Sequence, residues 1–571
     1  MIVILLVWVF IFVSSFSFGL ITRRVLGVLT GGVAPLSIAF TSVTGLATQV
    51  VLLSYCSLFM PISNIGLLVG GTAVTLAATW YFRSSFASVW ETIKTTWQTT
   101  DLLHKLFIAI FFLFILIKAS GQVQSLDSGS YHLPFIKWVE QHKLITGLGN
   151  VHSRFGFNYH YHILYAFYGL AGVFGTTIHG LNGYLFLIGF VYLFGMYAKP
   201  GLHVFHKVAA ILAMLYISQI NKGMTGFSPD FPVAIVQMII VFECLRNLTA
   251  RQQQAESKAD ENYFLLSIFW LTFGAITLKL ATVSVMFVVL IVFARRLFRP
   301  QIFLSLVVFA GLVFFPYFFR NYTISGYLVY PFYSVDIFNV PWKIPMARTV
   351  DEKIVIKNFA LGYPYYYKGA YNYNLELFKT WIKNLAYLNK AYPPIIAIIA
   401  FCLMATVIKW IWQVVRKGAA GLKSPANIIL FGLAAGILFW FYNAPDPRFG
   451  NGIILPFIAI VLGEMFISAG LTRWVKPMAT VAMVAVIASS ILSLSGMALS
   501  QTVYQTNYVS ISLLLQEKYP APDTTSKTVD QYHTWLSKER CWECPLPCSY
   551  TYDSFHLAEP GNMEKGFLPW R

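Results

Sequence analysis

The chain has 571 residues, of which 57% are hydrophobic and only 11% are charged. Soluble domains carry about 25% charged residues, so this composition excludes a soluble globular protein. The net charge of +18 would suggest a nucleic-acid partner in a soluble protein. Here the basic residues separate apolar runs and so indicate membrane topology. We expect an all-α polytopic membrane protein with the lipid bilayer as a partner and no nucleic acid.

About fourteen transmembrane helices are expected, because apolar runs recur at close to the roughly 20 residues that span a bilayer. They cover residues 2–20, 36–59, 64–82, 104–119, 181–197, 208–220, 231–244, 264–278, 281–294, 302–319, 395–412, 428–442, 453–468 and 478–497. Arg23 and Arg24 follow the first run, whereas a signal peptide carries its charges before it. We therefore expect a retained first span.

Segment 159–175 is expected to be a re-entrant or surface helix. If it crossed the membrane, Arg295, Arg296 and Arg299 would lie outside, against the positive-inside rule. Its histidines and tyrosines also suit an interface better than hydrocarbon. The predicted regions are therefore N-terminal helices (1–120), a first external loop (121–180), central helices (181–319), a large external aromatic-rich loop (320–392), C-terminal helices (393–498) and an external C-terminal domain (499–571).

Three cysteines lie close together in the C-terminal region, at Cys541, Cys544 and Cys548. Zinc would need a fourth ligand, and only His533 and His556 are available there. On the outer side of a membrane a local disulfide is favoured, which leaves one cysteine free.

Asp127 is the candidate catalytic base. It follows the apolar run 104–119 and precedes Tyr131 and His132, so a carboxylate and an imidazole are expected at a membrane face. The alternative is that Asp127 caps a following helix. Asp230 carries the same two alternatives, because it follows Ser-Pro at the start of a span.

Polar residues gather on the predicted external side, at the ends of several spans. Lys279 lies between two short apolar helices, where a lysine is costly unless it faces a cavity or a partner such as phosphate. Asp446 and Arg448 are two residues apart and could instead pair to hold a turn. The candidate substrate-binding residues are Arg154, Asn158, Asp230, Lys279, Arg320, Lys343, Tyr365, Tyr366, Asp446 and Arg448. Each arginine has an alternative role as a headgroup anchor, and the tyrosines could form an interfacial belt.

This pattern resembles the GT-C superfamily of membrane glycosyltransferases, which carry an acid in an early external loop. The matching pieces are Asp127-Ser-Gly-Ser-Tyr-His132, Gly147–Asn158, Ser228-Pro-Asp230, Ser325–Pro331 with Trp342-Lys343, Ala444–Gly450 and Cys541–Cys548. Within that superfamily the chain is similar to large bacterial membrane proteins of little-characterised function. The resemblance covers most of the chain.

The resemblance implies inverting transfer of a hexosyl or pentosyl group from a polyprenyl-phosphate donor to an envelope acceptor, at the outer leaflet of the bacterial inner membrane. Asp127 then acts as the base, His132 as an acid or a ligand, and Arg154, Lys279 and Arg448 hold the phosphate. No second acid follows Asp127 before Glu140, a departure from the superfamily pattern that leaves open whether a divalent cation binds near Asp127. The alternatives are a transporter or flippase of lipid-linked saccharides, a polymerase or ligase of them, and a structural subunit.

Overall fold

The computed structural model describes residues 1–571 except 124, 200, 220, 254–256, 365–366, 370, 372, 389–391, 504–511, 539, 551–554 and 570–571. The candidate residues Tyr365 and Tyr366 lie outside the described residues.

Long helices form the body of the protein. The first group is α1 (Ile2–Thr30), α2 (Ile38–Cys56), α3 (Ile65–Tyr81), α4 (Arg83–Thr99) and α5 (Leu102–Ser120). The central group is α9 (Leu181–Ala198), α10 (Val204–Gln219), α11 (Asp230–Gln253), α12 (Lys258–Leu278), α13 (Val283–Phe293) and α14 (Pro300–Ser325). The last group is α17 (Tyr392–Lys417), α18 (Pro425–Asn443), α19 (Pro447–Ser468) and α20 (Val475–Val503).

Short elements connect these groups. Between α5 and α9 lie η1 (Ser128–His132), α6 (Leu133–Gln141), η2 (Leu148–Asn150), η3 (Ser153–Phe157), α7 (Tyr161–Tyr168) and α8 (Ala171–Phe174). Between α14 and α17 lie α15 (Met346–Leu361) and α16 (Leu375–Leu388). Single turns are η4 (Asn221–Met224), η5 (Leu280–Thr282), η6 (Gly418–Lys423), η7 (Leu471–Trp474) and η8 (Met563–Lys565).

Eleven helices among the described residues are long and apolar enough to cross a membrane, or twelve if the bent pair α3–α4 forms one span. The chain is therefore a multi-pass membrane protein. The expected number of about fourteen also counted α10 and α13, which are shorter apolar helices of 16 and 11 residues. At 1.5 Å per residue α13 extends only about 16 Å, well short of a bilayer core of about 30 Å.

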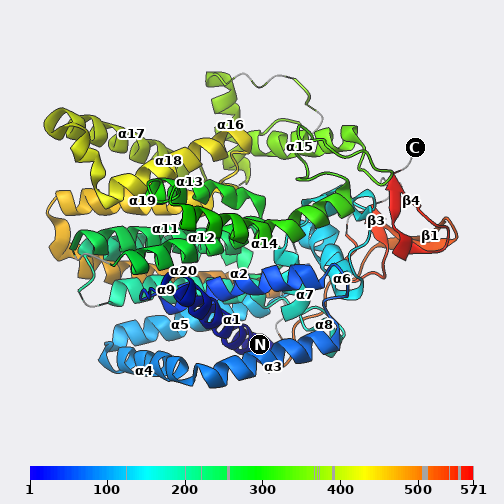
Figure 1. Ribbon diagram of the computed structural model, residues 1–571, viewed down its shortest axis with the longest axis horizontal. Helices are drawn as coiled ribbons and strands as arrows, with labels where there is room; N and C mark the ends of the chain where they lie inside the picture. Colours follow the sequence, from blue (N-terminus) through cyan, green and yellow to red (C-terminus); the bar gives the residue numbers. More distant parts are fainter. Residues whose placement is uncertain are drawn as a thin grey trace.

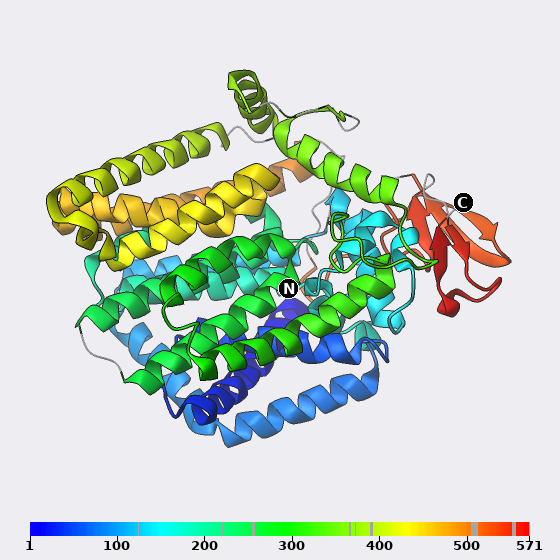
Figure 2. The ribbon, with the colours of Figure 1, turned by 45° about the horizontal axis from the view of Figure 1, so that its top comes forward.

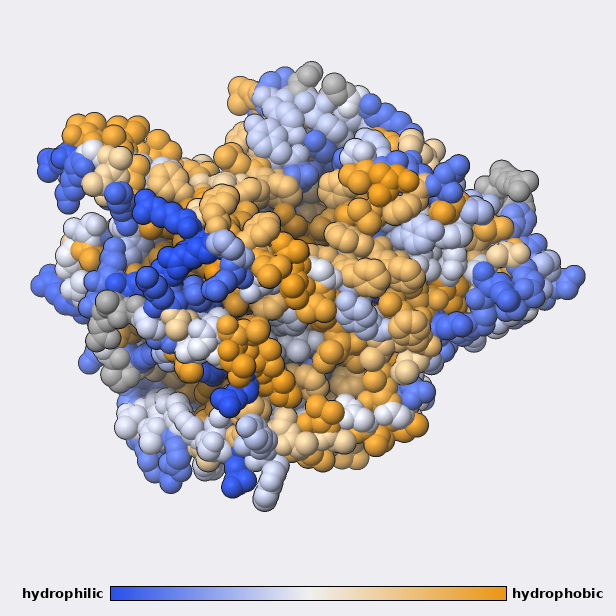
Figure 3. All heavy atoms as spheres, in the orientation of Figure 1, coloured by the Kyte–Doolittle hydropathy of each residue, from blue (hydrophilic) through white to orange (hydrophobic). Residues whose placement is uncertain are grey.

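The spans lie side by side, and several of the longer connecting segments lie toward one end of the bundle (Figures 1 and 2). The α6–α8 segment, α15 and the C-terminal strands lie toward the right of both views, and we call this the cavity end. In Figure 3 apolar residues cover much of the middle of the surface, whereas hydrophilic residues gather toward its left and right ends. That distribution is the one expected of a protein surrounded by lipid.

Segment 159–175 does not form a surface helix, which corrects one of the two expectations for it. All eight residues of α7 are buried, and the helix ends where Leu170 takes a φ of 51°. The hydroxyl groups of Tyr161 and Tyr165 donate to the Asn182 side chain at 2.6 and 2.8 Å. These bonds satisfy the polar ends of the rings, and α7 therefore belongs to the protein interior.

The C-terminal region is built from strands, so the all-α expectation holds only for the membrane part. One sheet contains β1 (Thr524–Val529), β2 (Tyr532–Ser537) and β3 (Cys548–Tyr550), with β1 antiparallel and β3 parallel to β2. A second, antiparallel sheet pairs β4 (Phe555–Leu557) with β5 (Phe567–Pro569). The expected local disulfide is confirmed: it joins Cys541 to Cys548 and leaves Cys544 as a buried free thiol.

Candidate functional site

A cavity of about 750 Å³ opens at the cavity end of the bundle. Its walls come from the segment around η1, from η3, from the start of α11, from η5 and α13, and from α14, α15, α18 and α19. These elements are far apart in the sequence, so the cavity exists only in the folded chain. It brings together six of the predicted functional residues: Asp127, His132, Arg154, Asp230, Lys279 and Arg448.

The first charged group in the wall is centred on Arg154. Its Nη1 lies 3.5 Å from Asp127 Oδ1, and its Nε donates to Glu352 Oε1 at 3.0 Å. The Ser153 hydroxyl donates to the second Glu352 oxygen at 3.0 Å. The guanidinium also lies over the ring of Tyr131, 4.9 Å from its centroid. One cation thus orients two carboxylates and is itself fixed by an aromatic face.

The Asp127 carboxylate does not cap the helix that follows it, which contradicts the capping alternative. Asp127 has a helical backbone (φ −58°, ψ −35°), and its side chain makes no capping hydrogen bond. The side chain is 40% exposed and lines the cavity. A carboxylate in this position can accept a proton from a hydroxyl group bound in the cavity.

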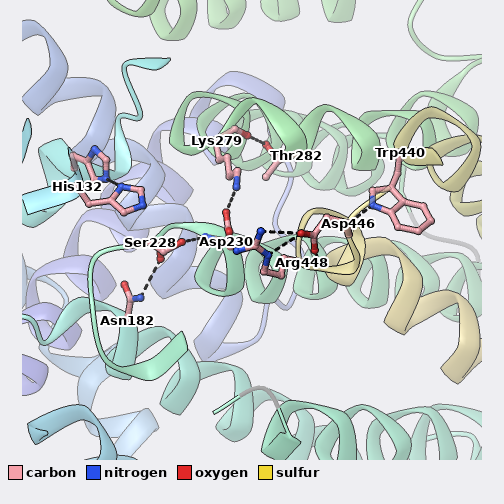
Figure 4. A network of polar contacts seen from close by, with 10 residues as sticks. His132, Asn182, Ser228, Asp230, Lys279, Thr282, Trp440, Asp446 and Arg448 are labelled. Carbon is pink, nitrogen blue, oxygen red and sulfur yellow. Dashed lines mark hydrogen bonds and ion pairs between the residues drawn. The ribbon is translucent and has the colours of Figure 1, made fainter. Parts of the chain in front are cut away.

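The second charged group joins α11, α12 and α19, and Figure 4 shows its side chains. The Lys279 ammonium pairs with Asp230, and both side chains are about nine-tenths buried. Arg448 donates from Nε and Nη2 to Asp446 Oδ2 at 3.0 and 2.8 Å. In this view the Asp230 carboxylate lies between the Lys279 ammonium and the Arg448 guanidinium. The α12 C-terminus and the α11 N-terminus therefore bring their charged residues face to face.

The two groups share one electrostatic environment. Burial, and then repulsion from Arg448, lower the pKa of the Lys279 ammonium from its usual value, while Asp446 and Asp127 oppose that shift. Lys279 also lies 4.4 Å from the centroid of the Phe449 ring. A bound anion would favour the charged ammonium, because an opposite charge at close range offsets the cost of burial.

His132 lines the same cavity, and its Nδ1 is 2.9 Å from His162 Nε2. Burial, and then the charges of His162, Lys279 and Arg154, hold the pKa of His132 well below its usual value. The imidazole is therefore neutral near pH 7, which argues against the proposed role of His132 as an acid. A neutral ring can still accept or donate one hydrogen bond to a ligand.

Two predicted binding residues are placed behind the cavity wall, where they hold helices together. Arg320 is 2% exposed, and its guanidinium donates to Asn158 Oδ1 at 2.9 Å and to Ser57 Oγ at 2.7 Å. Ser57 follows the last residue of α2, so the guanidinium lies at the negative end of that helix dipole. Asn158 and Arg320 thus serve the packing of α2 and α14, and neither lines the cavity.

Lys343 and Asp446 also lie outside the cavity lining. The Lys343 ammonium pairs with Asp336 and donates to the Phe338 carbonyl at 2.8 Å, which closes the loop after α14. Asp446 is fully buried, and its side chain caps α19 by accepting from the Arg448 N–H at 2.9 Å. The alternative that Asp446 and Arg448 pair to hold a turn is confirmed, and Arg448 reaches the cavity from that turn.

Glu352 is the acidic residue of the cavity wall that sequence reasoning missed. It lies on α15 within the predicted aromatic-rich loop, in the charged triplet Asp351-Glu352-Lys353. The adjacent acids Asp351 and Glu352, in an otherwise aromatic segment, are the sequence feature that could have indicated this site residue. α15 also contributes Lys353, Ile356 and Phe359 to the cavity. This helix therefore covers the site, a function that the length of the loop alone did not reveal.

The residues do not fit a resident metal ion. Among the described residues, no group of three or more His, Cys, Asp or Glu side chains is arranged to hold one. The two carboxylates that face each other across the first group, Asp127 and Glu352, share the Arg154 guanidinium. A divalent cation between them would meet this fixed positive charge.

Acid pH is expected to destabilise the cavity end, because its buried histidines are neutral in the folded state. Burial is the main cause that lowers the pKa of His152 and His162 to about 3 and that of His179 to about 4. Burial also holds the pKa of His132 and His160 well below the usual value. Below about pH 6.5 the unfolded chain binds protons that the folded chain does not, so the free energy of unfolding falls with pH. Burial raises the pKa of Glu140 to about 8, and this group acts in the opposite sense.

Each of the five histidines is expected to cost roughly 1–2 kcal/mol between pH 7 and pH 5. The single glutamate offsets only part of this sum, so we expect a net fall in the free energy of unfolding. Thermal unfolding of the purified protein at the two pH values measures this loss. An unchanged or higher midpoint at pH 5 would show that the histidines are already protonated in the fold.

The fold and the site define a multi-pass membrane protein with a charged, aromatic-walled cavity at one end of its helix bundle. Residues 1–455 match the family model described as "Domain of unknown function (DUF8201)", and the chain belongs to this family. The curated proteins contain no match to the chain. The solved structures contain none either. All six predicted residues that line the cavity, Asp127, His132, Arg154, Asp230, Lys279 and Arg448, lie within the matched region.

Proposed function

We propose that the protein is a membrane glycosyltransferase that transfers a sugar from a polyprenyl-phosphate donor to an acceptor hydroxyl group. The observation that carries this proposal is that one cavity joins a partly exposed carboxylate, Asp127, to the cations Arg154, Lys279 and Arg448. Group transfer from a phosphate needs a base for the incoming hydroxyl and positive charge for the leaving phosphate. The resemblance of the sequence to the GT-C superfamily supports the same function.

In the proposed reaction, Asp127 accepts the proton of the acceptor hydroxyl group as its oxygen bonds to the anomeric carbon. The bond from that carbon to the phosphate oxygen breaks, and the polyprenyl phosphate leaves with the electron pair. Lys279 and Arg448 stabilise its charge. Arg154 orients Asp127 through their ion pair. The carboxylate attacks no carbon, so one displacement inverts the anomeric configuration.

The remaining walls suit the two ends of such a donor. Tyr131, Tyr159 and Tyr330 line the cavity near Arg154 and offer faces on which a sugar ring can stack. Tyr317 on α14 and Phe439 on α18 line the part of the cavity that is formed by membrane-spanning helices. A prenyl chain would leave the site along this apolar side and enter the bilayer, since apolar area is best kept out of water.

Neutralising the Lys279–Asp230 pair is expected to weaken donor binding. The double substitution Lys279→Met with Asp230→Asn removes the cation without leaving a buried unpaired carboxylate. Loss of a charge-assisted hydrogen bond should raise the Kd for polyprenyl phosphate about 10- to 100-fold. Native mass spectrometry of the protein in nanodiscs, titrated with the lipid, measures the change.

The matched control is Lys343→Met with Asp336→Asn, a Lys–Asp pair outside the cavity. Equal weakening by both double variants would argue against a phosphate site at Lys279. The same nanodiscs, supplied with lipid-linked sugars, separate bond cleavage from transport. Release of polyprenyl phosphate supports a transferase, and movement of the intact lipid between leaflets supports the flippase alternative.

A further inference from the structure

The turn that follows Asp127 has a backbone carbonyl without a helical partner. In η1 the Leu133 N–H donates to the Ser128 carbonyl, five residues back, as in a π-helix. The next donor in this pattern, for the Gly129 carbonyl, would be residue 134, which is proline and has no N–H. A buried carbonyl in this position needs a partner from elsewhere in the chain.

The disulfide-closed segment Cys541–Cys548, which we call the cysteine loop, supplies that partner. The N–H groups of Cys541 and Trp542 both donate to the Gly129 carbonyl, at 3.0 and 2.9 Å. The Lys137 ammonium on α6 donates in turn to the carbonyls of Glu543 and Cys544, at 2.8 and 3.0 Å. The cysteine loop and the η1–α6 segment thus each donate hydrogen bonds to the other.

Packing at this contact is as specific as the hydrogen bonding. The Trp542 ring covers Gly129 so closely that a Cβ on the glycine would lie 2.6 to 2.8 Å from three ring atoms. Trp542 is 2% exposed, and its ring stacks on that of Tyr519 with 6.2 Å between the ring centroids. Its backbone takes a φ of 44°, which a tryptophan adopts only when its surroundings hold it there. The Cys541–Cys548 disulfide closes the loop that does so.

We propose that the cysteine loop is a positioning element for the cavity: it fixes η1, and through η1 the side chains of Asp127 and His132. An intact Cys541–Cys548 disulfide is then a requirement for the geometry of the site. The loop lies outside the family match, which ends at residue 455. The effect on catalysis rests on the proposed transferase function, whereas the fixing of η1 does not.

Hydrogen–deuterium exchange of the full-length protein in nanodiscs tests the proposal without a substrate. In the variant Cys541→Ser with Cys548→Ser, the amides of residues 128–133 are expected to exchange about tenfold faster, because the bonds to Gly129 are lost for part of the time. The control is Cys544→Ser, which removes the free thiol of the same buried cluster and keeps the disulfide. Peptides from α19 report whether the bundle is intact.

Two further substitutions separate positioning from general stability. Gly129→Ala should displace the Trp542 ring and speed exchange at η1 even with the disulfide present, and adding Trp542→Ala should reverse most of that increase by making room. Pro134→Ala restores an N–H where the π-turn needs one, so breaking the disulfide in that background should speed exchange less than threefold.

Exchange at residues 128–133 that stays unchanged when the disulfide is removed would overturn the proposal. A tenfold increase in both the wild-type and Pro134→Ala backgrounds would also overturn it, because the loop would then support the fold without holding the Gly129 carbonyl. Either result leaves the transferase proposal standing. A protein that shows the expected exchange but transfers no sugar would refute the transferase and leave the positioning role in place.

Discussion

Replacing Asp127 by asparagine should lower the rate of sugar transfer by a factor of about 10² to 10⁴, the range over which general bases contribute. The amide is nearly isosteric with the carboxylate but cannot accept the acceptor proton. Asp127 is partly exposed and makes no capping bond, so the fold should not depend on its charge. The measurement is release of polyprenyl phosphate by wild-type and variant protein at saturating donor.

The matched control for this prediction is Asp351→Asn. Asp351 is a half-exposed aspartate on α15 that pairs with Lys368 and does not line the cavity. This control should retain the wild-type rate, and both variants should keep the wild-type melting temperature. Wild-type transfer by Asp127→Asn would rule out the base mechanism. It would shift support to a ligase or polymerase that depends on the cations of the cavity alone.

Among the single substitutions, Arg448→Met is expected to have the largest effect on stability. The Asp446 carboxylate is fully buried, and Arg448 supplies both its ion pair and two side-chain donors. Removing one partner of a buried pair leaves an uncompensated charge, at a cost of about 2–4 kcal/mol once the partial exposure of Arg448 is allowed for. Thermal unfolding of the purified protein should show the corresponding fall in melting temperature.

Adding Asp446→Asn to Arg448→Met should recover most of that loss. Asparagine carries no charge and still caps the start of α19 by accepting from the residue 448 N–H. The double variant should therefore be stable yet bind donor weakly, which separates the two roles of Arg448. If the double variant is no more stable than the single one, the cost lies in lost packing of Arg448 on Phe359 and Phe449 and not in the buried charge.

Local signals allowed most of the architecture to be predicted. Apolar runs located the spanning helices, and the two-residue spacing of Asp446 and Arg448 raised their pairing as an alternative to substrate binding. Hydropathy could not show how long α10 and α13 would be, because their ends depend on the turns at Asn221–Met224 and Leu280–Thr282. The C-terminal strands are only three to six residues long, which is too short for a reliable alternating pattern.

Long-range contacts decided the parts of the site that were not predicted. Arg320 is of a residue type that often binds phosphate. Its partners Asn158 and Ser57, however, are 162 and 263 positions away in the sequence, and they hold Arg320 in the interior. Glu352 meets Arg154 across 198 positions. Neither contact can be predicted from the local sequence. Asp127, Lys279 and Arg448 were found because each stands near the end of an apolar run, where an unexplained charge is conspicuous.

The position of a bound lipid phosphate can be determined from an experimental structure of the protein in nanodiscs with polyprenyl phosphate. We expect phosphate density within hydrogen-bonding distance of Lys279 and Arg448, in the cavity that Asp127 lines. The prenyl chain should leave past Tyr317 and Phe439 into the bilayer. A lipid phosphate bound elsewhere on the protein, with this cavity filled by side chains, would contradict the account and favour a structural or transport role.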